Sequence, residues 1–142
     1  MFNSDYVVGL IDGEGSFTVY IKNPDENKKL KRRVKAESRF YLKLIEKDKE
    51  VLCRLKEFFG CGNVYFQKDI RPSHQNCYRY EVASRKDLQE KIIPFFKLNH
   101  LKLPSKIRDF DIFCKLIEMM DKGKHLNLNG LRKMYRIKQK MH

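Results

Sequence analysis

The sequence predicts an α+β domain in which helices cover one face of a four-stranded antiparallel sheet. Four segments alternate apolar and polar side chains with the period of two that is typical of half-buried strands. Other segments repeat apolar side chains every three or four residues, as amphipathic helices do. Their order is helix, strand, strand, helix, strand, strand, helix. This order favours a sheet with helices on one face and a second face left free.

The first predicted element is a short helix over residues 7–12, which Ser4 or Asp5 can cap. Gly9 and Gly13 lie four residues apart and therefore share one face of this helix. Each glycine costs about 1 kcal/mol relative to alanine in a helix, so the pair needs a packing reason. A bare glycine face lets a second backbone approach closely. Since the chain has no apolar run near the ~20 residues of a membrane span, we expect another protein helix as the partner.

Glu14 follows this helix directly and is flanked by Gly13 and Gly15. A carboxylate is unfavourable at the C-terminal end of a helix, where the helix dipole is negative. A nearby divalent metal ion would remove that penalty.

The strands are expected at residues 16–23, 33–42, 63–68 and 77–84. The alternation assigns one set of side chains to the covered face: Phe17, Val19, Ile21, Val34, Ala36, Ser38, Phe40, Leu42, Val64, Phe66, Tyr78, Tyr80 and Val82. The free face then carries basic, amide and hydroxyl groups. Such groups can read base edges in the major groove of DNA. The predicted DNA-binding residues are Thr18, Tyr20, Lys22, Lys35, Arg39, Tyr41, Tyr65, Gln67 and Arg79. Glu37 and Glu81 on the same face are expected to pair with neighbouring cations or to accept from cytosine.

The remaining helices have clear boundary signals. One is expected from Asp48 to Phe59, and a second begins at the capping box Ser84-x-x-Asp87 and ends at Pro94. A third begins at Pro104 and stops before Gly123. The last covers residues 129–140, within a basic helical segment of about residues 124–142. From Lys122 to the end this tail has no acidic residue, so it is either a solvated helix or a further phosphate contact.

Composition restricts the function classes. The chain has 142 residues, a formal net charge of +13 and a pI of about 9.7. We interpret residues 1–142 as a single domain, and the charge predicts a polyanionic partner. An acidic membrane surface is the competing partner, but neither an isolated basic amphipathic helix nor a lipidation motif is present. No membrane partner is therefore predicted.

The four cysteines form no Cys-x-x-Cys pair and are expected to be reduced thiols. Cys61, His74 and Cys77 could form part of a zinc site, although unrelated loop and strand residues are the favoured interpretation.

Residues 7–15, Val-Val-Gly-Leu-Ile-Asp-Gly-Glu-Gly, resemble the signature of the LAGLIDADG homing endonucleases. Gly9, Leu10, Ile11, Asp12 and Gly15 match that signature, and Phe17 continues its usual Gly-Ser-Phe ending. The resemblance implies the αββαββα fold of this family, with a saddle-shaped sheet. It also implies a site-specific double-stranded DNA endonuclease, encoded in an intron, that hydrolyses one phosphodiester in each strand.

Because the sequence holds one copy of the motif, the resemblance implies a homodimer on a long, near-palindromic site. The dimer interface would include Val8, Gly9, Asp12 and Gly13. Mg²⁺ is the expected cofactor, with Mn²⁺ as a plausible substitute. The Glu14 carboxylate and the Gly13 carbonyl would contact the metal. A catalytic lysine is expected at Lys106, with Lys102 as the second choice.

One departure bears on catalysis. Many family members have a glutamine where the second strand ends, whereas this chain has Lys43-Leu44-Ile45-Glu46. Lys43 or Glu46 could replace it, or the site could be impaired.

Two other functions stay open. The first is a non-catalytic DNA- or RNA-binding module of the same fold, such as an intron maturase or a regulator. The second is a basic protein-interaction domain. The N-terminus resembles neither a signal peptide nor an arginine-rich transit sequence. We therefore expect the protein to act where it is translated, in a chloroplast, a mitochondrion or a prokaryotic cytoplasm.

Overall fold

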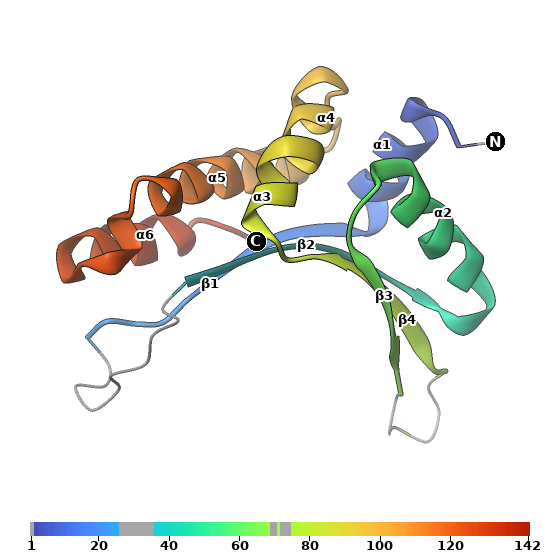
Figure 1. The fold of residues 1–142 in the computed structure, drawn as a ribbon, viewed down its shortest axis with the longest axis horizontal. Helices are drawn as coiled ribbons and strands as arrows, with labels where there is room; N and C mark the ends of the chain where they lie inside the picture. Colours follow the sequence, from blue (N-terminus) through green and yellow to red (C-terminus); the bar gives the residue numbers. More distant parts are fainter. Residues whose placement is uncertain (1, 26–35, 69–70, 72–74) are drawn as a thin grey trace. The chain divides into compact units, whose positions relative to one another are not determined.

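The computed structural model describes residues 2–25, 36–68, 71 and 75–142. Its chain forms two compact units, one of residues 1–16 and 39–103 and the other of residues 17–38 and 104–142. Four strands build one sheet in the order β1-β2-β4-β3 (Figure 1). The predicted α+β class and the predicted order of elements are confirmed. Lys35, a predicted DNA contact, and His74 of the zinc alternative lie outside the described residues.

The first unit contains most of the sheet. Its elements are α1 (Ser4–Glu14), β2 (Ala36–Ile45), η1 (Glu46–Asp48), α2 (Lys49–Phe59), β3 (Asn63–Gln67), β4 (Cys77–Val82), α3 (Arg85–Asp87), the π-helix η2 (Leu88–Ile92) and α4 (Ile93–Leu98). In the second unit, β1 (Gly15–Ile21) is followed by α5 (Pro104–Asp121), η3 (Lys124–Leu126) and α6 (Leu128–Lys138).

Antiparallel pairing sets the two faces of the sheet in the first unit. On one face, Phe40 lies opposite Val82 and Leu42 opposite Tyr80. Helices cover this face, since Phe59 of α2 and Phe96 of α4 both contact the Phe40 ring. On the other face, Tyr41 lies opposite Glu81, and Arg79 lies between Lys43 and Tyr65. The predicted strand alternation is therefore confirmed for β2 and β4.

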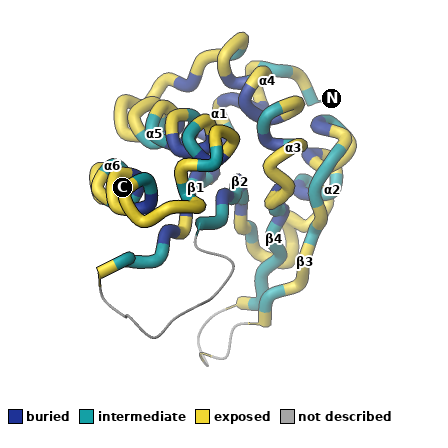
Figure 2. The backbone as a smooth tube through the Cα atoms, turned by 60° about the vertical axis from the view of Figure 1, so that its left-hand side comes forward, coloured by how far each residue is buried: buried dark blue, intermediate teal, exposed yellow. Residues whose placement is uncertain are grey.

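The second unit follows the same rule. Phe17, Val19 and Ile21 of β1 are buried, whereas Thr18 is half-buried and Tyr20 is exposed. Figure 2 shows the burial of each element along the backbone. The Phe17 ring packs against Phe110 and Phe113 of α5, with ring centroids 5.1 and 5.3 Å apart. The helix α5 thus covers the apolar side of β1 and does not cover its polar side.

Three local predictions are wrong, each for a physical reason. Asn3, rather than Ser4 or Asp5, caps α1 by accepting a hydrogen bond from the Tyr6 N–H. The Phe66 side chain is 51% exposed, because it lies at the end of β3 against Tyr78 instead of under a helix. Pro94 does not end its helix: the π-turn before it places Pro94 in the first turn of α4, where a missing N–H costs nothing.

The boundaries of the other helices are close to those predicted. Ser84 accepts a hydrogen bond from the Asp87 N–H, as the capping box requires. Asp48 occupies the cap position of α2 without a side-chain hydrogen bond. No helix in the described ranges is both long and apolar enough to cross a membrane.

Candidate nucleic-acid interface and active site

The helix α1 has two chemically different sides. Val7 and Ile11 have no exposed surface, so this side is packed into the chain. Gly9 and Gly13 are exposed, and a Cβ atom added at either would meet no atom of the described residues within 4 Å. The glycine face is therefore open, as the predicted interface with a second helix requires. Val8, also predicted at that interface, is only 7% exposed.

Asp12 has a role that the sequence did not reveal. Its carboxylate is 8% exposed and accepts hydrogen bonds from the backbone N–H groups of Lys102, at 3.1 and 2.8 Å, and Leu103, at 3.2 Å. These bonds tie α1 to the segment just before α5. The Asp12 side chain thus faces its own chain, whereas the interface prediction gave it to a partner helix.

Glu14 is the last residue of α1 and is exposed. The residue after Glu14 is still bonded to the helix, because the Gly15 N–H donates a hydrogen bond to the Ile11 carbonyl. A Cβ at Gly15 would lie only 2.7 Å from the Ile11 side chain, so a glycine is needed where the chain leaves the helix for β1. The carboxylate of Glu14 and the nearby Gly13 carbonyl are both hard oxygen donors, the type that Mg²⁺ prefers.

The described part of one chain does not complete a metal site. Within residues 2–25, 36–68, 71 and 75–142, no group of three or more His, Cys, Asp or Glu side chains could hold a metal ion. A metal ion bound at Glu14 would therefore need further oxygen ligands from outside the described residues, such as phosphates or a second carboxylate.

The two candidate lysines lie in different units. Lys102 is in the same unit as Glu14, and its backbone is held by Asp12, two residues before Glu14. Lys106 lies in the second unit, in the first turn of α5. Sequence counting alone could not distinguish them, because the Asp12 bond spans ninety residues of chain.

The polar face of the first unit gathers predicted DNA-binding residues from three strands. Glu81 on β4 forms ion pairs with Arg79 at 2.9 Å and Arg39 at 3.6 Å, which confirms the expectation that Glu81 pairs with neighbouring cations. The Arg79 guanidinium lies 3.6 Å from the centroid of the Tyr41 ring. Tyr65, with 48% of its surface exposed, lies across from Arg79 on β3. Gln67 pairs with Cys77 at the end of the same ladder.

The departure at the end of β2 also has a defined geometry. Leu44 lies opposite Tyr78 and therefore shares the face of Leu42 and Tyr80. Lys43 is exposed and lies opposite Arg79, on the polar face. Of the groups considered as replacements for the family glutamine, Lys43 is placed among the polar side chains.

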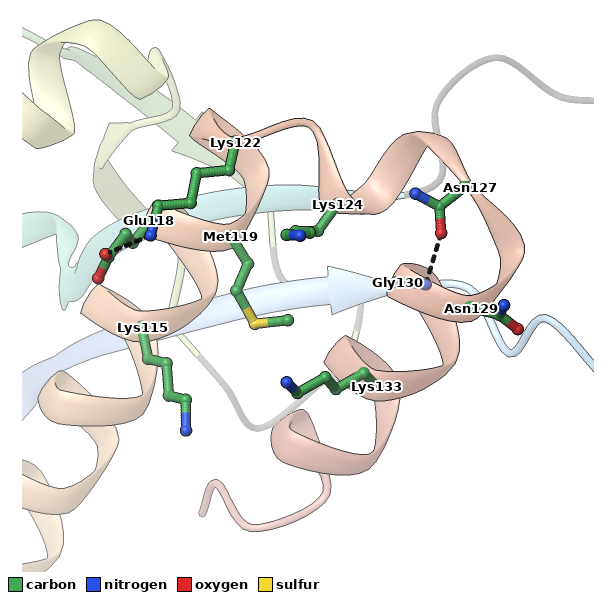
Figure 3. Close-up of a pocket in the computed structure, with 9 residues that line it drawn as sticks. All are labelled: Lys115, Glu118, Met119, Lys122, Lys124, Asn127, Asn129, Gly130 and Lys133. Carbon is green, nitrogen blue, oxygen red and sulfur yellow. Dashed lines mark hydrogen bonds and ion pairs between the residues drawn. The ribbon is translucent and has the colours of Figure 1, made fainter.

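The basic tail and the C-terminal part of α5 line a pocket in the second unit. The pocket has a volume of about 470 Å³ and lies among α5, η3 and α6 (Figure 3). Its lining includes Lys115, Lys122, Lys124 and Lys133, and one acid, Glu118, which pairs with Lys122 at 3.0 Å. The Asn127 side chain caps α6 by accepting from the Gly130 N–H at 2.7 Å. This basic concavity suits an anion, and the predicted phosphate contact of the tail stays a prediction.

The cysteines carry no site in the described structure. None of the four forms a disulfide. Burial and the neighbouring Asp87 carboxylate raise the pKa of the Cys61 thiol, so it is neutral at physiological pH. The zinc alternative stays untested, because His74 lies outside the described residues.

Comparison with known proteins identifies similar chains. Residues 7–117 match the profile of a family described as LAGLIDADG endonuclease. The chain is 31% identical to the homing endonuclease I-ApeII of Aeropyrum pernix over 120 residues, which is 84% of this chain and 65% of that protein. It is also 31% identical over 134 residues to a Neurospora crassa protein named "Probable intron-encoded endonuclease 3", of which it spans 23%. The chain thus spans less than two thirds of either relative.

Solved structures with a similar fold are homing endonucleases as well. The homing endonuclease I-TnaI superimposes with a TM-score of 0.81 at 31% identity, covering 99% of this chain and 88% of that one. I-SmaMI, a LAGLIDADG homing endonuclease solved with cleaved DNA, superimposes with a TM-score of 0.83 at 32% identity. That match covers the whole of this chain and 44% of I-SmaMI.

We expect Asp12→Asn to lower the free energy of unfolding by roughly 1–3 kcal/mol, because hydrogen bonds to a charged acceptor are lost or weakened. Urea unfolding followed by circular dichroism measures the change. Asp111→Asn is the matched control: Asp111 is exposed on α5, and its substitution should stay within about 0.5 kcal/mol of the wild type. Equal stability of the two variants would contradict a structural role of the Asp12 carboxylate.

Proposed function

The chain belongs to the LAGLIDADG endonuclease family, and from this premise we propose that it is a site-specific endonuclease acting on double-stranded DNA. The exposed Glu14 beside the open glycine face of α1 is the observation that carries the proposal. A module that only binds nucleic acid would not need a carboxylate facing phosphates. Relatives solved with bound DNA support DNA as the partner.

The glycine face supports a dimer of this chain. Gly9 and Gly13 leave room for another backbone, and the sequence carries a single motif. I-TnaI is a chain of similar length, whereas I-SmaMI is about twice as long. We propose that two copies of α1 pack through these glycines, so that one Glu14 serves each scissile phosphate on a near-palindromic site.

Divalent metal, with Mg²⁺ first and Mn²⁺ as a substitute, fits the donors at the end of α1. The Glu14 carboxylate and the Gly13 carbonyl would hold it, and the remaining ligands would come from DNA and the second copy. When bound, the metal neutralises phosphate charge and lowers the pKa of bound water. The chain's own contribution is to fix the carboxylate at a rigid helix end, which preorganises the site.

We assign the lysine role to Lys102 in preference to Lys106. Asp12 fixes the Lys102 backbone to the turn of α1 that precedes Glu14. The Lys102 ammonium group would stabilise charge developing on the phosphate. Lys43, exposed on the polar face, is the candidate to orient water in place of the family glutamine.

A non-catalytic module of the same fold remains the second candidate function, favoured by the absence of that glutamine in the Lys43–Glu46 segment. Action in an organelle or a prokaryotic cytoplasm, where the protein is translated, is part of the proposal.

Glu14→Gln should keep DNA binding and lower cleavage by roughly a hundredfold or more, since the amide cannot replace a charged metal ligand. The substrate is first recovered by selection of cleaved sites from a randomised duplex library, with and without Mg²⁺. Cleavage is then followed on gels and binding by fluorescence anisotropy. Cleavage at the wild-type rate would remove the proposed role of Glu14, and binding without any cleavage by the wild type would favour the non-catalytic module.

Gly9→Ala combined with Gly13→Ala should weaken the dimer at least tenfold, because the added methyl groups separate the two helices. Neither methyl would come within 4 Å of an atom in the part of the chain that the structure describes, and alanine favours a helix by about 1 kcal/mol per site. The monomer should therefore be as stable as the wild type or more so. Sedimentation equilibrium measures the dimer, and thermal unfolding below its dissociation constant provides the control. An unchanged dimer would contradict the glycine interface.

Lys102→Met should slow cleavage about a hundredfold at nearly constant DNA affinity, whereas Lys106→Met should change the rate less than threefold. Methionine keeps much of the lysine stem and removes the charge. Single-turnover rates at saturating protein compare the two variants directly. The opposite ranking would return the role to Lys106.

A further inference from the structure

Glu81 is an acid in the middle of a face predicted to bind DNA. It lies on β4, opposite Tyr41 on β2 and Asn63 on β3. Its side chain is 14% exposed, and one of its oxygens, Oε1, faces both the Arg79 and the Arg39 guanidinium groups. A single carboxylate thus gathers two arginines from neighbouring strands.

The Arg79 guanidinium is fixed on more than one side. It is paired with Glu81 at 2.9 Å and lies 3.6 Å from the Tyr41 ring centroid. Its Nε atom is buried and has no hydrogen-bond partner among the described residues. Burying a donor without an acceptor is unfavourable, so the ion pair and the ring contact must hold the side chain against that cost. Arg79 is therefore ordered before any DNA arrives.

The charge around Arg79 explains why an acid is useful there. Lys43 lies directly across from Arg79, and like charges in that position destabilise a strand pair. Glu81 offsets this repulsion. It also reduces the net charge of the Arg39, Arg79 and Glu81 group from +2 to +1. Attraction to DNA phosphates is independent of sequence and grows with the number of available cations. Glu81 thus weakens the part of DNA binding that cannot distinguish one sequence from another.

Fixing the arginine side chains in place has a different effect: it improves the discrimination between DNA sequences. A mobile arginine can reach phosphates and several base edges, whereas a fixed one offers its donors in one geometry. Ordering side chains before binding also removes an entropy cost from the specific complex. A carboxylate that arranges two arginines therefore trades sequence-independent affinity for discrimination.

We propose that Glu81 is a specificity-determining positioning residue, which holds Arg39 and Arg79 as one ordered group on the DNA-binding face. This inference rests on the proposed DNA-binding function and adds a residue that acts through other side chains. A purely structural role is the alternative, because a half-exposed strand ion pair can simply contribute to folding.

The test compares Glu81→Gln with Glu50→Gln. Glutamine is nearly isosteric, so each variant loses one negative charge. Glu81→Gln also loses its ion pairs with Arg79 and Arg39, and Glu50→Gln loses its ion pair with Arg54. Glu50 pairs with Arg54 at 3.3 Å on α2, whose Phe59 packs on the opposite, covered face of the sheet. Both variants raise the net charge of the chain equally, so any difference between them reflects the position of the charge.

For Glu81→Gln we expect tighter binding to a random-sequence duplex, by about threefold or more, and a plot of log affinity against log salt that is steeper by about one unit. In parallel selections from a randomised duplex library, the sites bound by Glu81→Gln should lose base preference at a few neighbouring positions. The affinity ratio of selected to random duplex should fall at least fivefold. Glu81→Asp, which keeps the charge, should restore part of this ratio, and Glu50→Gln should behave as the wild type.

Each outcome decides the matter. An unchanged ratio for Glu81→Gln, with only a lower unfolding midpoint, would leave Glu81 with a structural role and overturn the inference. Equal effects of Glu81→Gln and Glu50→Gln would reduce it to net charge and overturn it as well. If the wild type itself enriches no sequence, the proposed site-specific function fails instead, and that result is visible before any variant is compared.

Discussion

The helix α1 must be packed into its own chain on one side and left bare on the other. Val7 and Ile11 provide the packed side, while Gly9 and Gly13 leave the opposite side open. A helix with two glycines is intrinsically weak, so its position depends on contacts other than helix propensity. The Asp12 carboxylate supplies one such contact by binding the backbone of Lys102 and Leu103. Everything proposed for Glu14 depends on this anchored helix.

The same anchoring explains why an acid is tolerated at the end of α1. The helix dipole disfavours Glu14, and Gly15 is fitted closely against Ile11, so the chain does not relax this position by moving away. A carboxylate in an unfavourable field gains more from a bound cation than one in a neutral field would. The local cost is therefore consistent with a site that is completed by ligands from outside the chain.

The alternation of buried and exposed residues along the strands made much of the fold predictable. The alternation in β1, β2 and β4 follows from a sheet covered on one face, and a period of two survives small errors in strand boundaries. Predictions failed where the local sequence pattern was overridden by the surrounding structure or by contacts between residues far apart in the sequence. A proline ends most helices, but a π-turn precedes Pro94 in this chain. Phe66 continues the apolar alternation of its strand at a position that the helices do not cover. The Asp12 bonds to Lys102 and the sharing of Glu81 by two arginines depend on tertiary contacts, which no spacing rule encodes.

Charge therefore works at two levels in this chain. The net charge of +13 draws the protein to any polyanion and carries no sequence information. Under the proposed function, discrimination between DNA sequences would come from a small number of ordered side chains on the polar face, and order there requires partners within the protein. Arg79 obtains these partners from Glu81 and Tyr41, on its own and the neighbouring strand. In a chain this basic, an acid on the binding face is therefore better explained by the arrangement of cations than by solubility, because the rest of the surface already supplies ample charge.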